Sequence, residues 1–383
     1  MSIIYLFVSL ILFLALCGLW IPSIPFLGET GALLESFLSL HLVLISIAIL
    51  LLSYFSFRKN GKKLMRYSAI LSCINLVGFA IPLGILISTA AKYDTSISWL
   101  AHITDKPVMG NPDLDKSVKY ASIDGHDLYM DISPPEKAVA PSGTPVIFLH
   151  GGGFVSGTRG QLPVWTAFFN RRGDTVFDVD YRLATPSYQT WDKATEDVAS
   201  AVAWVGNNAQ KYNVDMSKLI IVGSSAGGGL ALQVGYAIVN GKAQSYLEGD
   251  LAKPSAVVAI YPAQNLTPPW EEDAHFFGTP ARQFNTSYLG GSPTDYPEAY
   301  NATNPIKHLN SNLPPTIIIA GKNDHLLPYY GQEQLAQALS NTGIINQFVS
   351  LPFTDHAFDL FPNGLSAQIA FRQTELFLDK HHK

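Results

Sequence analysis

Cysteine is nearly absent from this chain of 383 residues, in which only Cys17 and Cys73 occur. Both lie within long apolar runs, where we expect them to face lipid or to pack between helices. A disulfide framework and a thiolate metal site each need cysteines at a recognisable spacing. The sequence therefore predicts neither, and the histidines show no metal-ligand spacing, so we predict no metal and no cofactor.

Charge is also scarce, since only 14% of the residues are charged and the net charge is -5. Binding of nucleic acid depends on lysine and arginine gathered into a basic patch. The chain offers no such patch, and a nucleic-acid partner is excluded. Its mean hydropathy of +0.17 instead indicates membrane-embedded sequence.

Three apolar runs occupy the first ninety residues, at about 3–20, 40–57 and 67–89. A helix needs about 20 apolar residues to cross the hydrocarbon core of a bilayer, and each run approaches or exceeds that length. Buried core helices are the alternative, but three uncharged runs in series disfavour it. We predict a membrane anchor of three transmembrane helices over residues 1–91.

The loops between these runs predict the orientation of the anchor. Residues 58–66 carry five basic side chains, whereas the first loop holds Glu29 and Glu35 and no lysine or arginine. Basic loops stay on the cytoplasmic side. The prediction is an integral protein of the plasma membrane with everything after Ala91 outside the cytoplasm. Signal-peptidase cleavage after Ala90 is an alternative, disfavoured because the apolar segment is longer than a usual signal sequence.

A linker over residues 92–117 leads into a domain over residues 118–383 in which strands and helices alternate. Asp124-Gly125 between two β-rich runs predicts a hairpin at its start. The pattern predicts a mostly parallel sheet with helices on both faces, and an insertion at 264–313 predicts a lid. The expected strands are 145–149, 175–179, 219–222, 256–261, 316–320 and 347–351, and the expected helices are 162–171, 191–212, 225–239, 331–340 and 365–378.

A short stretch after the strand at 219–222 carries the strongest chemical signal. Gly223-Ser224-Ser225-Ala226-Gly227 fits the pattern G-x-S-x-G, in which a sharp turn between strand and helix lifts a serine oxygen above the sheet. Only Ser225 has glycines two residues away on both sides. We predict Ser225 as a nucleophile.

Other strand ends supply the groups that such a nucleophile needs, because chemistry in parallel sheets collects at the carboxyl ends of the strands. Asp324 and His356 each follow a strand, and the chain order serine, acid, histidine is the required one. Backbone N–H groups of Gly152, Gly153 and Ala226 are the predicted oxyanion hole.

Several neighbouring residues are alternatives with less support. We interpret Asp355 as a loop carboxylate, His325 as a surface or pocket-edge residue, and His150 as a brace for the oxyanion loop. Arg182 and Asp197 are predicted to form a structural ion pair. In the lid, either an acyl pocket or local packing would explain the aromatic residues Trp270, Phe276 and Phe277.

Together these motifs resemble the α/β-hydrolase superfamily, in particular the hormone-sensitive-lipase-like esterases and their bacterial relatives. The resemblance covers about residues 118–383. It rests on HGGGF at His150, DYRLA at Asp180, GSSAGG at Gly223, D-x-x-x-P at Asp324 and DHAF at Asp355. It implies the α/β-hydrolase fold and ester hydrolysis. The chain departs from the family pattern at Ser224, where aspartate is usual, and at Thr185-Pro186.

The sequence therefore predicts a membrane-anchored serine hydrolase that cleaves a small-molecule or lipid carboxylic ester through an acyl-enzyme on Ser225. An acyltransferase or peptidase with the same triad is one alternative, because an acyl-enzyme does not dictate what attacks it. A catalytically silent receptor or adhesion module is another, because fold does not imply function. The oligomeric state cannot be predicted.

Overall fold

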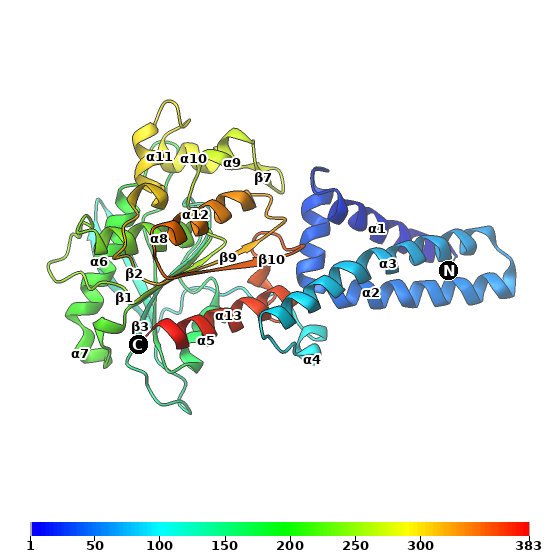
Figure 1. Cartoon of the computed structure of the whole chain (residues 1–383), viewed down its shortest axis with the longest axis horizontal. Helices are drawn as coiled ribbons and strands as arrows, with labels where there is room; N and C mark the ends of the chain where they lie inside the picture. The colour runs from blue at the N-terminus through cyan, green and yellow to red at the C-terminus, as the bar shows by residue number, and fades with distance from the viewer. Residues whose placement is uncertain (1, 383) are drawn as a thin grey trace.

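Three long apolar helices form a bundle at one end of the molecule. They are α1 (Ser2–Trp20), α2 (Leu27–Asn60) and α3 (Lys63–Lys92) in the computed structural model, which describes residues 2–382. Each contains an apolar window long enough to cross a membrane. The prediction of three apolar helices is confirmed, and the bundle extends away from the rest of the protein (Figure 1).

Small polar side chains hold the bundle together from within. The hydroxyl of Ser9 on α1 lies 3.0 Å from that of Ser68 and 2.9 Å from that of Ser72, both on α3. Asn75 donates to the carbonyl of Ser9 at 2.8 Å, and Ser53 on α2 contacts Ser68 at 2.8 Å. Hydrogen bonds of this kind between helices stabilise packing inside a bilayer.

Helix α2 begins earlier than its apolar run and bends on the way. Leu38 has non-helical backbone angles, φ -129° and ψ 22°, and divides the helix in two. The part before the bend carries Glu29 and Glu35, both buried, and lies between the bundle and the rest of the protein (Figure 1). Because these two glutamates interrupt the apolar pattern, the sequence did not predict that this part of α2 is helical.

An eight-stranded sheet forms the centre of the larger part of the molecule, with the order β1-β2-β4-β3-β5-β6-β9-β10. The first three of these strands pair antiparallel, and all remaining pairs are parallel. The mostly parallel sheet of the predicted fold class is confirmed. The strands are β1 (Ser117–Ile123), β2 (His126–Ser133), β3 (Pro145–Leu149), β4 (Thr175–Val179), β5 (Ile220–Ser224), β6 (Ala256–Ile260), β9 (Thr316–Gly321) and β10 (Asn346–Leu351).

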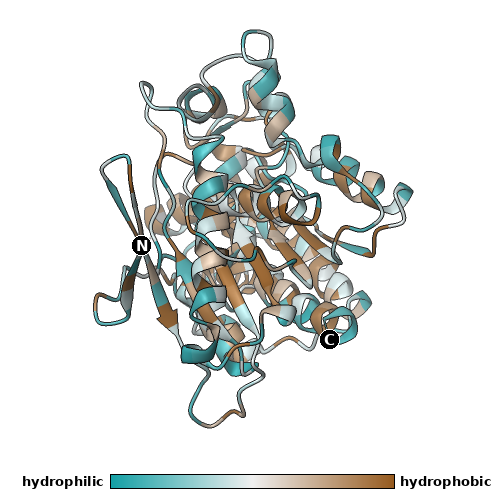
Figure 2. Cartoon of the chain, turned by 90° about the vertical axis from the view of Figure 1, so that its left-hand side faces the viewer, coloured by the Kyte–Doolittle hydropathy of each residue, from teal (hydrophilic) through white to brown (hydrophobic). Residues whose placement is uncertain are grey.

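Helices cover both faces of this sheet. One face packs on α6 (Lys193–Asn207), α8 (Ala226–Val239) and α12 (Tyr329–Asn341), and the other packs on α5 (Pro163–Arg171) and α13 (Leu365–His381). Figure 2 shows the hydrophobic strands between helices whose outer faces are hydrophilic. The helix expected at 191–212 is shorter than predicted, because the backbone leaves helical geometry at Asn208 before α7 (Ala209–Tyr212).

The remaining elements are short and lie in the linker, the insertion and the connections. They are α4 (Trp99–Ile103), α9 (Thr267–Glu271), β7 (His275–Phe276), β8 (Thr279–Pro280), α10 (Ala281–Leu289), α11 (Pro297–Thr303) and the 3-10 turns Met216–Lys218, Pro305–His308 and Phe358–Leu360. The strands β7 and β8 pair as a small antiparallel hairpin. This hairpin belongs to the predicted lid insertion.

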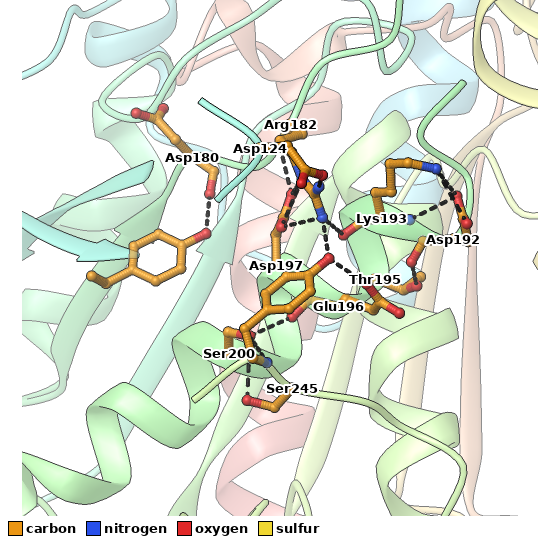
Figure 3. Close-up of polar contacts among 12 residues, drawn as sticks. Asp124, Asp180, Arg182, Asp192, Lys193, Thr195, Glu196, Asp197, Ser200 and Ser245 are labelled. Carbon is orange, nitrogen blue, oxygen red and sulfur yellow. Dashed lines mark hydrogen bonds and ion pairs between the residues drawn. The ribbon is translucent and has the colours of Figure 1, made fainter. Parts of the chain in front are cut away.

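A buried ion pair ties the end of β4 to α6, as predicted for Arg182 and Asp197. The Arg182 Nε and backbone N–H both donate to the Asp197 carboxylate, at 3.0 and 2.8 Å, and both side chains are buried. Arg182 also donates to Asp124 in the hairpin at 2.7 Å and to the hydroxyl of Tyr246 (Figure 3). One guanidinium thus joins three separate segments of the chain.

Replacing the acidic partner should destabilise the protein strongly. In Asp197→Ala the guanidinium of Arg182 stays buried without its main counter-charge, so we expect a loss of about 3–5 kcal/mol in the free energy of unfolding. Urea-induced unfolding of the detergent-solubilised protein measures it. Asp127→Ala, which removes the exposed pair with Lys119, is the matched control and should leave the unfolding midpoint unchanged. Equal midpoints for the two variants would contradict the assigned role.

Candidate active site

Ser225 occupies a strained turn between β5 and α8. Its backbone angles are φ 52° and ψ -119°, a conformation that side-chain-bearing residues rarely adopt. The glycines around it are required by space, because a Cβ on Gly223 would lie 2.2 Å from the carbonyl oxygen of Gly227. A Cβ on Gly227 would lie 2.1 Å from that of Leu149 on β3. The predicted elbow geometry is therefore present.

The structure brings Ser225, His356 and Asp324 together in one chain of hydrogen bonds. The Ser225 Oγ lies 2.9 Å from the Nε2 of His356, and the His356 Nδ1 lies 2.9 Å from the Oδ2 of Asp324. The Oδ1 of Asp324 accepts the backbone N–H groups of Leu326 and Leu327 at 3.0 and 2.8 Å. These two bonds hold the Asp324 carboxylate in place while its Oδ2 faces the His356 ring.

The environment of His356 decides its charge. Burial lowers its pKa, but the charge of Asp324 and its hydrogen bond to the ring outweigh burial, so the pKa lies above the ordinary value of 6.5. With Nδ1–H donating to Asp324, the neutral ring presents its Nε2 lone pair to the serine hydroxyl. This is the arrangement that general-base activation of a serine requires.

The predicted oxyanion donors lie beside the serine. Gly152 and Gly153 have φ values of 120° and 61°, and Ala226 is the first residue of α8, where backbone N–H groups lack a partner within the helix. A Cβ on Gly152 would lie 2.0 Å from the carbonyl oxygen of Ser156, so this loop depends on glycine. Gly152 and Gly153 line the same cavity as Ser225, and Ala226 directly follows the serine.

His150 supports this loop without contacting the triad. Its ring stacks on Tyr181 with centroids 4.4 Å apart, and its Nδ1 lies 2.7 Å from the carbonyl oxygen of Gly151. The Tyr181 hydroxyl donates to the His150 carbonyl at 2.8 Å. These contacts are those of the predicted brace.

A small, mainly apolar cavity of about 220 Å³ opens onto the serine. Of the three aromatic residues considered for an acyl pocket, only Phe276 lines it, and Phe284 and Tyr261 are two further aromatic residues in its wall. Trp270 instead packs under Arg282, and Phe277 points to the exterior. The other residues that line the cavity include Met109, Gly152, Gly153, Gln161, Leu162, Leu326 and Leu360.

Tyr261 is a neighbour of the triad that the sequence analysis did not single out. Its ring contacts that of His356 edge-on at 4.7 Å, and its hydroxyl donates to Asp359 at 2.5 Å. Asp359 also accepts the indole N–H of Trp165 at 2.7 Å. Tyr261 directly follows β6, so the rule that points to strand ends could have found it.

Asp355 holds the two catalytic loops to each other. Its Oδ1 accepts the backbone N–H of His325 at 3.1 Å and that of His356 at 2.7 Å. Its Oδ2 lies 2.7 Å from the Nδ1 of His325. Burial lowers the pKa of His325, but the bond to Asp355 outweighs it and raises the pKa to about 9. His325 and Asp355 thus form a partly buried, hydrogen-bonded pair beside the triad.

This pair also contacts the start of the chain. The Nε2 of His325 lies 3.0 Å from the carbonyl oxygen of Pro22, so the residue sits against the turn between α1 and α2 rather than at the pocket edge. The Asp355 backbone N–H donates to the Ser36 hydroxyl at 3.1 Å, and the Phe277 N–H donates to Glu29 at 2.9 Å. The first part of α2 therefore packs on the triad loops and on the lid hairpin.

No metal-binding cluster accompanies the site. Among residues 2–382, no group of three or more His, Cys, Asp or Glu side chains is placed to hold a metal ion.

Comparison with known proteins points to the same class of protein as the geometry of the site. The family model described as BD-FAE matches residues 130–339, which is more than half of the chain. Esterase LipC of Mycobacterium tuberculosis is 28% identical over 250 residues, and the match covers 62% of this chain and 58% of LipC. The carboxylesterase/phospholipase LipF of the same organism is 29% identical over 244 residues, covering 60% of this chain and 59% of LipF. This chain thus spans somewhat under three fifths of these two relatives.

A shorter relative is matched over more of its length. The ethyl acetate hydrolase of Pseudomonas putida is 27% identical over 264 residues, and the match covers 64% of this chain and 76% of that enzyme. Among solved structures, esterase 2 of Thermogutta terrifontis with bound propionate superposes with a TM-score of 0.58 at 23% identity. That superposition covers 70% of this chain and 96% of the esterase, and it shows a shared fold.

The raised pKa of His356 predicts the pH dependence of hydrolysis. The ring must be neutral to accept the serine proton, so we expect kcat/KM to fall as the pH drops through a midpoint above 6.5. Asp324→Asn removes the charge that raises this pKa. The residual activity should be lower by about 10³- to 10⁴-fold, and its acid midpoint should move to lower pH, because burial is then opposed only by the charges of Asp355 and Asp359. Rate measurements from pH 5 to 9 test this.

The exposed Asp250 provides the control for this pair of measurements. Asp250→Asn changes the net charge equally and should keep the wild-type rate and midpoint. An unchanged midpoint in Asp324→Asn, with His356 still required, would contradict the assignment of Asp324.

Proposed function

Because the chain belongs to the BD-FAE family of α/β-hydrolase esterases, we propose that it is a membrane-anchored serine carboxylesterase. One observation carries the proposal: the hydrogen-bonded series Ser225, His356 and Asp324 stands at the strand ends beside an apolar cavity and a glycine loop. The relatives named for esterase and ethyl acetate hydrolase activity support it.

In the first half of the reaction Ser225 attacks the ester carbonyl. His356 Nε2 takes the hydroxyl proton as the Oγ–carbon bond forms, and Asp324 stabilises the imidazolium. The N–H groups of Gly152, Gly153 and Ala226 stabilise the negative oxygen of the tetrahedral intermediate; a single donor of this type is worth about 10²- to 10³-fold in rate. The intermediate then collapses, and His356 passes its proton to the departing alcohol.

In the second half water hydrolyses the acyl-enzyme. His356 takes a proton from the water as it attacks the acyl carbonyl, and the same N–H groups stabilise the second tetrahedral intermediate. Release of the carboxylic acid returns the proton to Ser225. No group outside the described site is needed for either half.

The proposal includes an arrangement of the chain about a membrane. We assign residues 1–91 to the anchor, 92–117 to the linking segment, 118–383 to the hydrolase domain and 264–313 to its lid. The basic loop between α2 and α3 lies at the end of the bundle away from the hydrolase domain (Figure 1). With that loop in the cytoplasm, the hydrolase domain lies outside it, and we assign the protein to the plasma membrane.

Loss of the nucleophile tests the activity. Ser225→Ala should abolish hydrolysis of short p-nitrophenyl esters by the detergent-solubilised protein and should abolish labelling by a fluorophosphonate probe. Ser224→Ala is the matched control, because Ser224 lies one residue away on β5, and it should still be labelled. Wild-type hydrolysis in Ser225→Ala would refute the proposal.

The orientation can be measured independently of activity. Fusions of alkaline phosphatase and of green fluorescent protein to the C-terminus, made in a bacterial host, report opposite sides of the membrane. We expect an active phosphatase and a dark fluorescent protein, because the C-terminal helix α13 belongs to the hydrolase domain. A bright fluorescent protein would place that domain in the cytoplasm.

A further inference from the structure

The short helix α4 exposes apolar side chains on the hydrolase side of the bundle. Leu100 is 76% exposed and Ile103 is 45% exposed, and the Trp99 indole is partly exposed beside them. We call these three residues the α4 patch. Exposed apolar side chains gathered on one short helix indicate a contact that the isolated chain does not satisfy.

Contacts with α2 fix the level of the α4 patch relative to the bundle. The Nε2 of His41 lies 3.0 Å from the carbonyl oxygen of Ile103, and the Nε2 of His102 lies 3.5 Å from the Ser39 hydroxyl. The apolar run of α2 begins at residue 40. The patch therefore lies at the height where α2 passes from the hydrolase side into its apolar run, the position at which amphipathic helices and tryptophan lie at a membrane surface.

The segment after α4 leads directly to the cavity in front of Ser225. Its course is fixed by backbone bonds, from Val108 N–H to the Leu360 carbonyl at 2.8 Å and from Gly110 N–H to the Gln161 carbonyl at 3.0 Å. Met109 between them lines the cavity and is 63% exposed, so it stands at the mouth. Met109 lies six positions after Ile103 in the chain, a reach of at most about 20 Å.

The loops on the far side of the cavity are joined to the α4 patch as well. His102 contacts the carbonyl oxygen of Asn363 through its Nδ1 at 3.1 Å, and the Asn363 N–H donates to Asp105 at 2.7 Å. Asn363 follows the turn that contains Leu360, another residue of the cavity wall. The patch and the mouth thus belong to one connected piece of structure.

From these contacts we propose that the α4 patch lies in the surface of the bilayer and that the enzyme takes its substrate from there, as an ester carried by a lipid. This rests on the proposed esterase function and names its substrate class. The cavity of about 220 Å³ is smaller than the roughly 300–1,000 Å³ of pockets that enclose whole ligands. An acyl chain longer than the cavity therefore leaves through the mouth at Met109, which the segment after α4 borders.

The position of the α4 patch can be measured without any activity. Leu100→Cys, in a chain with Cys17→Ala and Cys73→Ala, is labelled with an environment-sensitive fluorophore and reconstituted in phosphatidylcholine vesicles. We expect quenching by phosphatidylcholine that carries a quencher on its acyl chains. Ile345→Cys is the control, since Ile345 is exposed just before the amino end of β10, whereas the loop of His356 follows the carboxyl end of that strand, and it should show no quenching. An unquenched label at position 100 would overturn the proposal, whether water or another protein surrounds it.

The substrate class is tested by comparing two esters in the same vesicles. The double variant Leu100→Asp/Ile103→Asp should cleave a long-chain ester dissolved in the bilayer at least tenfold more slowly than wild type. It should cleave water-soluble p-nitrophenyl acetate at the wild-type rate, which also shows that it is folded. Ile345→Asp should leave both rates unchanged.

The outcomes separate this inference from the function on which it rests. Equal rates of wild type and double variant on the bilayer ester would overturn the membrane-borne substrate while leaving the esterase intact. A wild type that cleaves neither ester would refute the esterase itself, and the quenching of the label at position 100 would still decide where the α4 patch lies.

Discussion

The carboxylate of Asp355 is the constraint on which the arrangement of the site depends. It accepts N–H groups from the loop after β9 and from the loop after β10, so the acid and the histidine of the triad cannot shift relative to each other without breaking its bonds. A buried carboxylate that satisfies several backbone donors is rigid, because every loss leaves a costly unpaired group. The 2.9 Å hydrogen bond between Asp324 and His356 joins the same two loops.

The fold was predictable from the sequence because the local and the global patterns agree. Strands β3, β5, β6 and β9 are buried apolar runs, and helix-like segments alternate with strands along the chain, so the sequence predicted a parallel sheet covered on both faces. The family membership and the shared fold of the esterase structures agree with it. Helix ends were less predictable; the break at Asn208 depends on local backbone geometry that periodicity does not report.

The parts of the candidate site that belong to a sequence motif could be predicted. The parts that depend on contacts between distant segments could not. The elbow at Ser225 and the residues after β9 and β10 are readable in order along the chain. The pairing of His325 with Asp355 cannot be read in this way, because these two residues also contact Pro22 and Ser36, some three hundred residues earlier in the chain. The same holds for the first part of α2, whose buried Glu29 and Glu35 break the apolar pattern that marks the rest of the helix.

The contact between Ser36 and Asp355 bears on the order in which the parts of the site form during synthesis. Synthesis reaches Ser36 some three hundred residues before Asp355, so the first part of α2 exists long before the loop that it contacts. Contacts so distant in sequence form late and slowly. Under the proposed function and membrane arrangement, a chain still under synthesis holds Ser225 without His356 and therefore cannot cleave lipid esters near it. The site is complete only when the loop after β10 has packed against the first part of α2.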